Sequence, residues 1–249
     1  MRGKCFCFLL IASFLVASLY AQQADELIIQ GDKLYEEMKD MATAKEALSK
    51  YQDALQMLEN KFEVFWRISR LHYYIGIHTE TNDEKKIVFS QGKYYADKAI
   101  NLEPERPEGH YWQGVNNGKY GESRGVLKSL FLVKPIKKAM NKVVELDESF
   151  EGGGAHRVLG RMYYKLPGFA GGSKKKSKEH LLKSLEFGPE DALTRLYLAE
   201  TYIEMKDIEK AKEQLDYILA MEDDPCWVPQ IMESKEEARK ILQKKEFKK

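Results

Sequence analysis

Three glycines are followed by a serine and three consecutive lysines in the segment LPGFAGGSKKKS, residues 166–177. Such a composition is typical of loops that hold a nucleotide phosphate through backbone N–H groups. A phosphate-binding loop, however, needs Gly-x4-Gly-Lys-Ser/Thr after a strand, whereas here the lysine comes one residue late and no strand precedes it. We therefore interpret the segment as a turn. Leu166 and Pro167 end one helix, because the residue before a proline avoids helical geometry, and Ser173 caps the next helix.

A second chemical motif is Gly121-Glu122-Ser123-Arg124-Gly125, which matches the Gly-x-Ser-x-Gly elbow of hydrolases. That elbow works because a strand-to-helix turn presents its serine strained and exposed. Here the motif follows two asparagines and a glycine in a helical context, so a flexible glycine-containing loop is the favoured interpretation. A hydrolase that uses Ser123 remains the enzymatic alternative. We expect the protein not to be an enzyme.

The metal-binding residue types do not form a site in the sequence. No two of the histidines have the i, i+4 spacing of a metal-binding helix, and no cysteine cluster accompanies them. We therefore predict no metal site and no cofactor. The formal net charge of +1 creates no overall field that would recruit nucleic acid or an anionic membrane, so no nucleic-acid partner is expected. The histidines are His72, His78, His110, His156 and His180.

The N-terminus has the composition of a secretory signal. Arg2 and Lys4 precede an uncharged apolar run over residues 5–20, and Ala21 supplies a small residue for cleavage. We predict a signal peptide over residues 1–21. The alternative is an uncleaved membrane anchor, for which a run of about sixteen residues is short.

A helix-pair repeat runs through the rest of the chain and predicts its architecture. The tetratricopeptide unit is a 34-residue helix–turn–helix with Leu, Gly and Tyr positions on the first helix and Ala and Phe positions on the second. Small residues at the Gly and Ala positions allow the two helix backbones to approach closely. In the clearest copy these positions are filled by Leu198, Ala199, Tyr202, Ala211 and Leu215.

Similar pairs can be followed along the chain, and 43% hydrophobic residues are enough for a sizeable core. We therefore predict an all-α, tetratricopeptide-like helical-repeat solenoid of about five helix pairs, forming a single domain over residues 22–249. The repeats are expected near residues 25–60, 61–104, 105–148, 152–189 and 190–224, followed by a C-terminal helix over 228–246.

The spacing inside the pairs varies. Ala199 and Ala211 are 12 positions apart, as in a standard unit, but the equivalent positions of the other four pairs are 16 to 22 apart. The extra residues are predicted to enlarge the turn that joins the first helix of a pair to the second. Insertions at one structural position collect on one face of a solenoid, which is often its binding face.

Aromatic and amide side chains concentrate in and before the two largest insertions. Rigid aromatic rings beside adaptable hydrogen-bonding groups are typical of ligand grooves, although the same rings could instead fill the helix–helix core. We take these residues as candidates for ligand or partner binding. They are Tyr73, Tyr74, Tyr111, Trp112, Asn116, Asn117 and Tyr120.

Residues 151–191 resemble the tetratricopeptide T component of TRAP-type (tripartite ATP-independent periplasmic) transporters. The resemblance rests on Gly-Gly-Gly before Arg157 and Arg161, followed by Leu-Pro-Gly-Phe-x-Gly-Gly-Ser with Phe169 and a lysine-rich helix. The sequence YWQGVNNG over residues 111–118 agrees with it. Arg157, Arg161 and Phe169 join the binding candidates. Members of that family are often lipid-anchored, but no lipid-attachment cysteine follows the apolar run here.

The resemblance implies a periplasmic, all-helical protein with a central groove for a small, hydrophobic ligand. It also implies partnership with a periplasmic solute-binding protein or another envelope protein, and allows self-assembly into a homo-oligomer. We therefore expect a non-enzymatic periplasmic binding protein, accessory to a TRAP-type solute transport system. The alternative is a general tetratricopeptide scaffold that holds peptide segments of proteins during envelope assembly.

Overall fold

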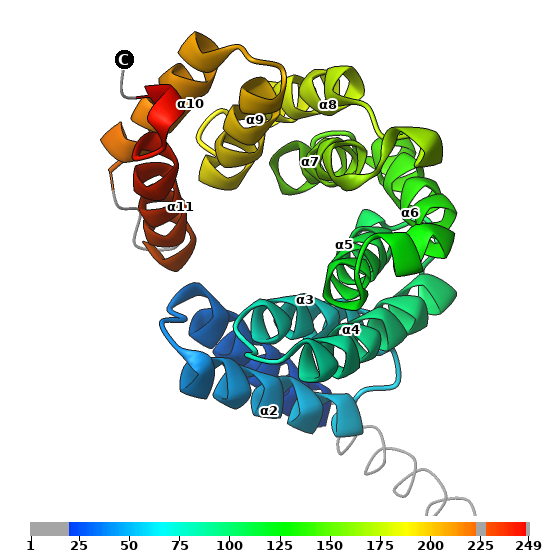
Figure 1. Ribbon diagram of the computed structural model, residues 1–249. Helices are drawn as coiled ribbons and strands as arrows, with labels where there is room; N and C mark the ends of the chain where they lie inside the picture. Colours follow the sequence, from blue (N-terminus) through cyan, green and yellow to red (C-terminus); the bar gives the residue numbers. More distant parts are fainter. Residues whose placement is uncertain (1–19, 223–227, 248–249) are drawn as a thin grey trace, which may run out of the picture.

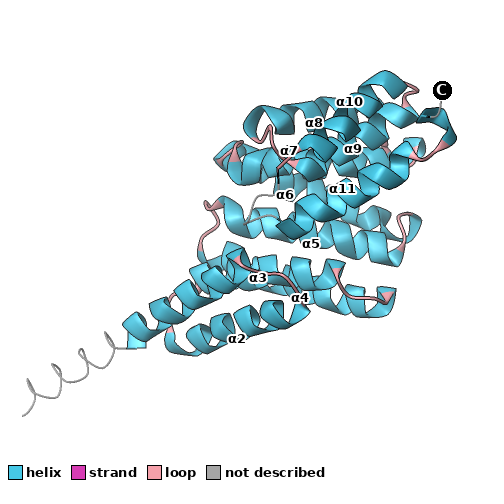
Figure 2. Ribbon diagram, turned by 90° about the vertical axis from the view of Figure 1, so that its left-hand side faces the viewer, coloured by secondary structure: helices cyan, strands magenta, loops and turns pink. Residues whose placement is uncertain are grey.

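The computed structural model describes residues 20–222 and 228–247, and every regular element in these two ranges is a helix. Seen from the side, the helix pairs stack from α2 at one end to α10 at the other, and no strand occurs in the described residues (Figure 2). The predicted all-α helical-repeat solenoid is therefore confirmed. The predicted signal peptide falls almost entirely on residues 1–19, which lie outside the described part.

Five helix pairs and one further helix make up the described chain. The first pair consists of a helix over residues 20–36 and α2 (Met41–Met57). The further helix is α11 (Val228–Leu242), which is followed by the short 3-10 helix η3 (Lys245–Phe247). The other pairs are α3 (Phe62–Ile77) with α4 (Asn82–Leu102), α5 (Pro107–Arg124) with α6 (Val133–Leu146), α7 (Phe150–Lys165) with α8 (Lys174–Phe187), and α9 (Ala192–Glu204) with α10 (Ile208–Ala220).

The pairs curve into a nearly closed ring. Helices α3, α5, α7 and α9 line its inner side, while α4, α6, α8 and α10 form the outer layer (Figure 1). Helix α11 packs on α9 and α10 and lies across the opening from the first helices of the chain (Figure 1). Within the described residues, no helix is both long enough and apolar enough to cross a membrane.

Side-chain caps mark where several helices begin. Asp40 accepts a hydrogen bond from the backbone N–H of Thr43 at 2.8 Å, and Asp191 does the same for Thr194 at 2.8 Å. Ser173 accepts one from the N–H of Lys176 at 3.2 Å, which confirms it as the N-cap of α8. Each cap satisfies an N–H group that has no partner inside its helix.

Glycines permit the close helix contacts that the repeat pattern predicts. A Cβ atom at Gly31 would lie 2.5 Å from the Tyr51 ring, and one at Gly160 would lie 2.7 Å from Leu181. Both glycines stand on the first helix of a pair and face the second. The small-residue positions therefore set how closely the two helices of a unit pack.

The extra residues inside the pairs are used in two ways. In the third and fourth pairs they enlarge the connecting turn, which contains the 3-10 helices η1 (Leu127–Leu132) and η2 (Gly168–Ala170) respectively. In the second pair they lengthen the helices, and the turn comprises only residues 78–81. Helix α5 continues to Arg124. The Gly121–Arg124 segment, which was expected to be a loop, is therefore helical, because its backbone continues the hydrogen-bonding pattern of α5.

The start of α7 has an unusual backbone. Glu151, Gly152 and Gly153 have φ values of 53°, 60° and 71°, in the left-handed region that favours glycine. A Cβ at Gly153 would lie 3.0 Å from the Ser184 carbonyl oxygen, so this bend also brings α7 close to the end of α8. The regular part of α7 begins after this bend and carries Arg157 and Arg161.

Candidate functional site: the central channel

The inner side of the ring encloses a channel. One part of it, which we call the deep cavity, has a volume of about 180 Å³ between α5, η1, α6 and α7, and Tyr35 and Tyr197 also line it. A second cavity of about 440 Å³ shares Tyr35, Tyr73 and Tyr197 with the first and extends to α11. The channel therefore reaches from the middle of the ring to the place where its two ends meet.

The base and the mouth of the deep cavity differ in chemistry. We call its aliphatic lining residues the base, and we call its phenol rings, cations and carboxylates, which come from five different repeats, the mouth. The base is formed by Val115, Leu132, Val133, Ile136, Val158 and Met162, and the mouth by Tyr35, Tyr73, Lys119, Glu122, Glu151, Arg157, Arg161, Lys165 and Tyr197.

Arg157 occupies a fixed position in this mouth. Its guanidinium donates to the Asp191 carboxylate at the start of α9 and to the Tyr111 hydroxyl at 2.7 Å. Although burial alone would lower the pKa of Arg157, Asp191 and Tyr111 hold it above the usual range. Arg157 is therefore a permanent cation that links α5, α7 and α9.

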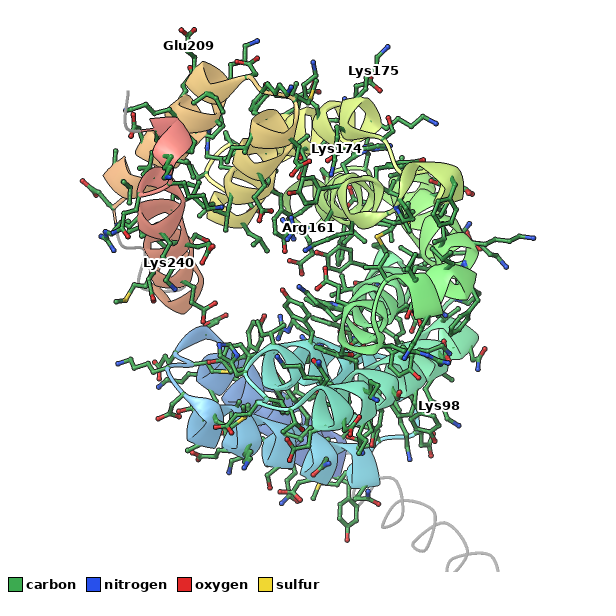
Figure 3. All side chains as sticks on the ribbon, in the orientation of Figure 1. Lys98, Arg161, Lys174, Lys175, Glu209 and Lys240 are labelled. Atoms are coloured by element: carbon green, nitrogen blue, oxygen red, sulfur yellow. The ribbon has the colours of Figure 1, made fainter. Side chains whose placement is uncertain are left out.

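Arg161 lies one helical turn further along α7. It forms an ion pair with Glu200 of α9, and its guanidinium carbon lies 4.0 Å from the centre of the Tyr197 ring. Figure 3 shows Arg161 pointing into the ring. Its Nε is buried and has no hydrogen-bond partner. Buried donors without partners are uncommon in folded proteins, so this group is an exception among the buried polar groups.

Lys119 and Glu122 of α5 form a pair at the same mouth, with 3.1 Å between Nζ and Oε2. The Tyr197 phenol and the Glu122 carboxylate raise the pKa of Lys119, against the effect of burial. Burial raises the pKa of Glu122, but Lys119 outweighs it and the pKa lies below the ordinary value. Both groups are therefore charged at neutral pH.

Two charged groups at the mouth have no ion pair. Lys165 forms none with any described residue, and burial together with the neighbouring Arg161 lowers its pKa. Glu151 likewise has no hydrogen-bonded partner among the described residues, and burial raises its pKa. The indole N–H of Trp112, which lines the cavity and is 5% exposed, is also unpartnered. Lys165 and Glu151 are therefore the charged groups of the mouth whose charge is not neutralised by a hydrogen-bonded partner among the described residues.

Half of the candidate residues from the sequence meet in the deep cavity. Tyr73 of α3, Tyr111 and Trp112 of α5, and Arg157 and Arg161 of α7 all line it. Tyr73 and Trp112 are in ring contact, with 5.8 Å between their centroids. Tyr74 lies instead in the second cavity, beside His78 and α11.

The other four candidates do not line the channel. Asn116 is fully buried and donates hydrogen bonds to the Ser69 and Trp112 carbonyls, which places it in the interface of α3, α4 and α5. Asn117 is 3% exposed and lies outside both channel cavities. Tyr120 faces a shallow depression against α4. Phe169 is 82% exposed on the turn between α7 and α8.

Other residues of the channel mouth have no signal in the sequence. Lys119, Glu122, Glu151, Lys165 and Tyr197 are ordinary charged or aromatic residues on predicted helices. They meet only because the curvature of the ring brings separate repeats together. The aromatic clusters could be found from the sequence, but the charges beside them could not.

The described residues offer no evident centre for hydrolysis or metal chemistry. Ser123 lies in the last turn of α5, where its hydroxyl donates to the Tyr120 carbonyl at 2.9 Å, rather than on a strand-to-helix elbow. No group of three or more His, Cys, Asp or Glu side chains suited to a metal ion occurs in the described ranges.

Residues 27–170 match the profile of a family described as regulator of microtubule dynamics protein 1-3. The chain is 28% identical over 183 residues to "Regulator of microtubule dynamics protein 3" of Rattus norvegicus, and 25% identical over 180 residues to the Mus musculus protein of that name. These alignments cover 73% and 70% of this chain, but only 36% of each relative. The chain thus spans about a third of the length of these relatives.

These matches overturn the resemblance to the TRAP-transporter component. Both named relatives are mammalian, and mammalian cells have no periplasm. The predicted family, the role as a transport accessory and the periplasmic location are therefore wrong. The expected solute-binding-protein partner loses its basis with them, because it was inferred only from that resemblance.

A solved structure supports the fold. The crystal structure of TTC0263, described as a thermophilic TPR protein in Thermus thermophilus, superposes with a TM-score of 0.67 at 14% identity. The superposition covers 88% of this chain and 98% of that chain. At this identity the likeness concerns the tetratricopeptide fold alone.

Proposed function

Because the chain belongs to the regulator of microtubule dynamics protein 1-3 family, we propose that it is a non-catalytic scaffold within a system that regulates microtubules. In this proposal the channel holds an extended segment of a protein partner. Tubulin is the first partner to test, since the related proteins are named for microtubule dynamics.

The observation that carries the proposal is the arrangement of apolar and charged groups in the channel. An extended peptide presents neighbouring side chains in different directions, so one can enter the apolar base while another stays at the mouth. An acidic side chain at the mouth would meet Lys165, the cation there that has no ion pair with a described residue. The unpartnered donors of Arg161 and Trp112 lie beside the same path.

The preformed mouth also favours binding over catalysis. Arg157 and Lys119 are held by neighbouring acceptors, so their side-chain order does not have to be created when a partner binds. Phenol rings such as Tyr73 and Tyr197 offer large contact areas with little conformational freedom to lose. These are the features by which helical-repeat proteins hold peptide segments on their concave face.

The experiment measures binding of the full chain to purified microtubules and to unpolymerised tubulin. Two variants alter the channel. Lys165→Glu reverses the free charge at the mouth, and Gly118→Trp fills the cavity, since a Cβ at Gly118 meets no other atom within 4 Å. The control is Lys98→Glu, which reverses an exposed charge on α4 away from the channel (Figure 3).

We expect the unaltered chain and the Lys98→Glu control to bind equally, and both channel variants to bind at least about tenfold more weakly. Equal binding by all four proteins would show that the channel is not the site. If the unaltered chain binds no form of tubulin, the microtubule partner is wrong. The scaffold proposal is then tested by selecting peptides that bind the unaltered chain from a random library. The proposal is wrong if every selected peptide binds the Lys98→Glu control and the two channel variants equally well.

A further inference from the structure

Two stretches of the sequence are free of acidic residues. Residues 125–144 and 152–178 contain no Asp or Glu, whereas the whole chain has 40 basic and 39 acidic residues. The first stretch comprises η1 and most of α6, and the second comprises most of α7, η2 and the start of α8. Because α6 packs on α7 and α7 on α8, the fold places these stretches side by side.

Lysines of these stretches gather on the outer surface of the ring. Lys134, Lys137 and Lys138 border a shallow depression together with Phe169. The Lys137 and Lys176 ammonium groups lie 5.2 Å and 5.5 Å from the centre of the same Tyr163 ring, which links α6 to α8. We call Lys134, Lys137, Lys138 and Lys176 the basic face.

Within the described part of the chain, the lysines of the basic face have no acidic partner beside them. None of the four forms an ion pair with a carboxylate in the described residues, whereas Lys93, Lys119 and Lys212 each pair with an acid three or four positions away. Their charge is therefore not neutralised locally. Its potential extends outward over about a Debye length, roughly 8 Å at physiological salt.

Large apolar side chains project beside this charge. Leu127 and Phe131 of η1 are 67% and 59% exposed, and Phe169 of η2 is 82% exposed. Arg124 lies 5.3 Å from the Phe131 ring, so this ring too has a cation beside it. The apolar groups stand on two separate short turns. Phe169 borders the shallow depression described above, whereas Leu127 and Phe131 do not line it.

We propose that the basic face and the turns beside it dock on an anionic lipid bilayer. Phe131 and Phe169 would enter the headgroup region, where aromatic side chains are favoured, and the lysines would contact lipid phosphates. Lysine side chains are long enough to keep their ammonium groups at the phosphates while their stems lie against apolar surface. An extended, flat and negatively charged partner fits both features, because it needs no enclosing groove.

This surface is separate from the channel. None of the four lysines of the basic face lines either channel cavity. Arg161 points into the ring, whereas Lys175, next to Lys176 at the start of α8, points away from its centre (Figure 3). Bound peptide and bound membrane would therefore not compete for the same residues. The proposal does not depend on what the channel holds.

The experiment measures co-sedimentation of the full chain with vesicles of phosphatidylcholine, with or without phosphatidylserine. We expect tighter binding when phosphatidylserine is present, and progressive loss of this binding as salt is added. In Lys134→Glu/Lys138→Glu we expect at least about twentyfold weaker binding, since each lysine at an anionic surface contributes about fivefold. All variants contain the apolar run at residues 5–20. Any vesicle binding due to this run is measured with vesicles of phosphatidylcholine alone.

The control is Lys45→Glu/Lys98→Glu, which reverses two exposed charges on α2 and α4. It should bind phosphatidylserine vesicles within about twofold of the unaltered chain, since these lysines lie off the basic face. A second readout is Phe169→Trp, whose fluorescence should shift to shorter wavelength on phosphatidylserine vesicles by more than that of the unaltered chain. Insertion predicts this shift, and simple charge attraction does not.

The proposal is overturned if both double variants lose binding equally, or if the Phe169→Trp emission does not shift. It is also overturned if phosphatidylserine does not increase binding of the chain to vesicles, while polyglutamate binds the unaltered chain and not Lys134→Glu/Lys138→Glu. In that case the basic face recognises an acidic protein surface.

Discussion

His78 and Glu233 lie 155 positions apart in the sequence, yet His78 Nε2 and a Glu233 carboxylate oxygen are 3.0 Å apart in the structure. His78 caps the end of α3 and Glu233 stands on α11, so this contact spans the gap between the two ends of the ring. Both residues border the second channel cavity. The contact therefore joins the two ends of the ring beside the second cavity.

The His78–Glu233 contact should depend on pH. The hydrogen bond to Glu233 raises the pKa of His78, and a second one to the Tyr74 carbonyl contributes in the same direction. A histidine whose folded-state pKa is raised stabilises the fold fully below its unfolded pKa, near 6.5, and loses that contribution as pH rises through the folded value. In Glu233→Gln we expect the pKa of His78 to fall toward 6.5, as measured by NMR titration. An unchanged titration would show that the contact does not form in solution.

Gly172 should be indispensable for the turn between α7 and α8. A Cβ at this position would lie 1.9 Å from the Leu166 carbonyl oxygen, and a backbone atom cannot move aside as a flexible side chain can. We expect Gly172→Ala to lower the free energy of unfolding by about 1–3 kcal/mol, measured by urea denaturation. Gly168→Ala in the same turn is the control, since its Cβ meets no atom within 4 Å. Equal losses in both variants would contradict the close approach.

Asn116 should contribute to stability and not to binding. Its amide donates to the Trp112 carbonyl at 2.9 Å and to the Ser69 carbonyl and hydroxyl at 3.2 Å, inside a fully buried interface. Asn116→Ala would remove these hydrogen bonds from a buried interface and leave a small cavity, which costs about 1–3 kcal/mol of unfolding free energy. The neighbouring Asn117 makes no side-chain hydrogen bond with a described residue, so Asn117→Ala should cost less in the same thermal or urea melt. The reverse order would refute this assignment.

Glu151 should destabilise the protein as its carboxyl group ionises. Burial raises its pKa, so the folded state holds this proton more tightly than the unfolded state. The stability it contributes therefore falls as pH rises from about 4.3, the ordinary glutamate value, through the higher folded value. Glu151→Gln keeps the side-chain shape without the charge, and its advantage in melting temperature over the unaltered chain should grow across this interval. A constant difference at all pH values would contradict the prediction.

The failed family assignment has a physical explanation. The Gly-Gly-Gly motif fits a left-handed bend at Gly152 and Gly153, and the Leu-Pro-Gly-Phe-x-Gly-Gly-Ser motif fits the close approach at Gly172. Both are solutions to backbone geometry in a tetratricopeptide turn. Such motifs indicate the fold, which was predicted correctly, but they carry no information about what the channel binds.

The fold could be predicted because its determinants are local. Pairs such as Gly160 with Leu181, or Gly31 with Tyr51, meet within one helix–turn–helix unit, and the repeat pattern records them directly. The helix caps are also local, and Ser173 could be identified from the sequence alone. The extra residues of the second pair were harder to place, because a longer helix and a longer turn satisfy the same spacing.

By itself, the sequence determined the helix pairs, their number and the small residues that pack them, since each depends on contacts between neighbouring elements. Only the tertiary structure decided which charges face the channel, as with Arg157 and Asp191 or Lys119 and Tyr197, because the curvature of the ring brings separate repeats together. It also decided that lysines of α6 and α8 share one outer face, which a near-zero net charge conceals. The periodicity of side chains along a helix can be read from the sequence, whereas the superhelical curvature results from the sum of many packing contacts.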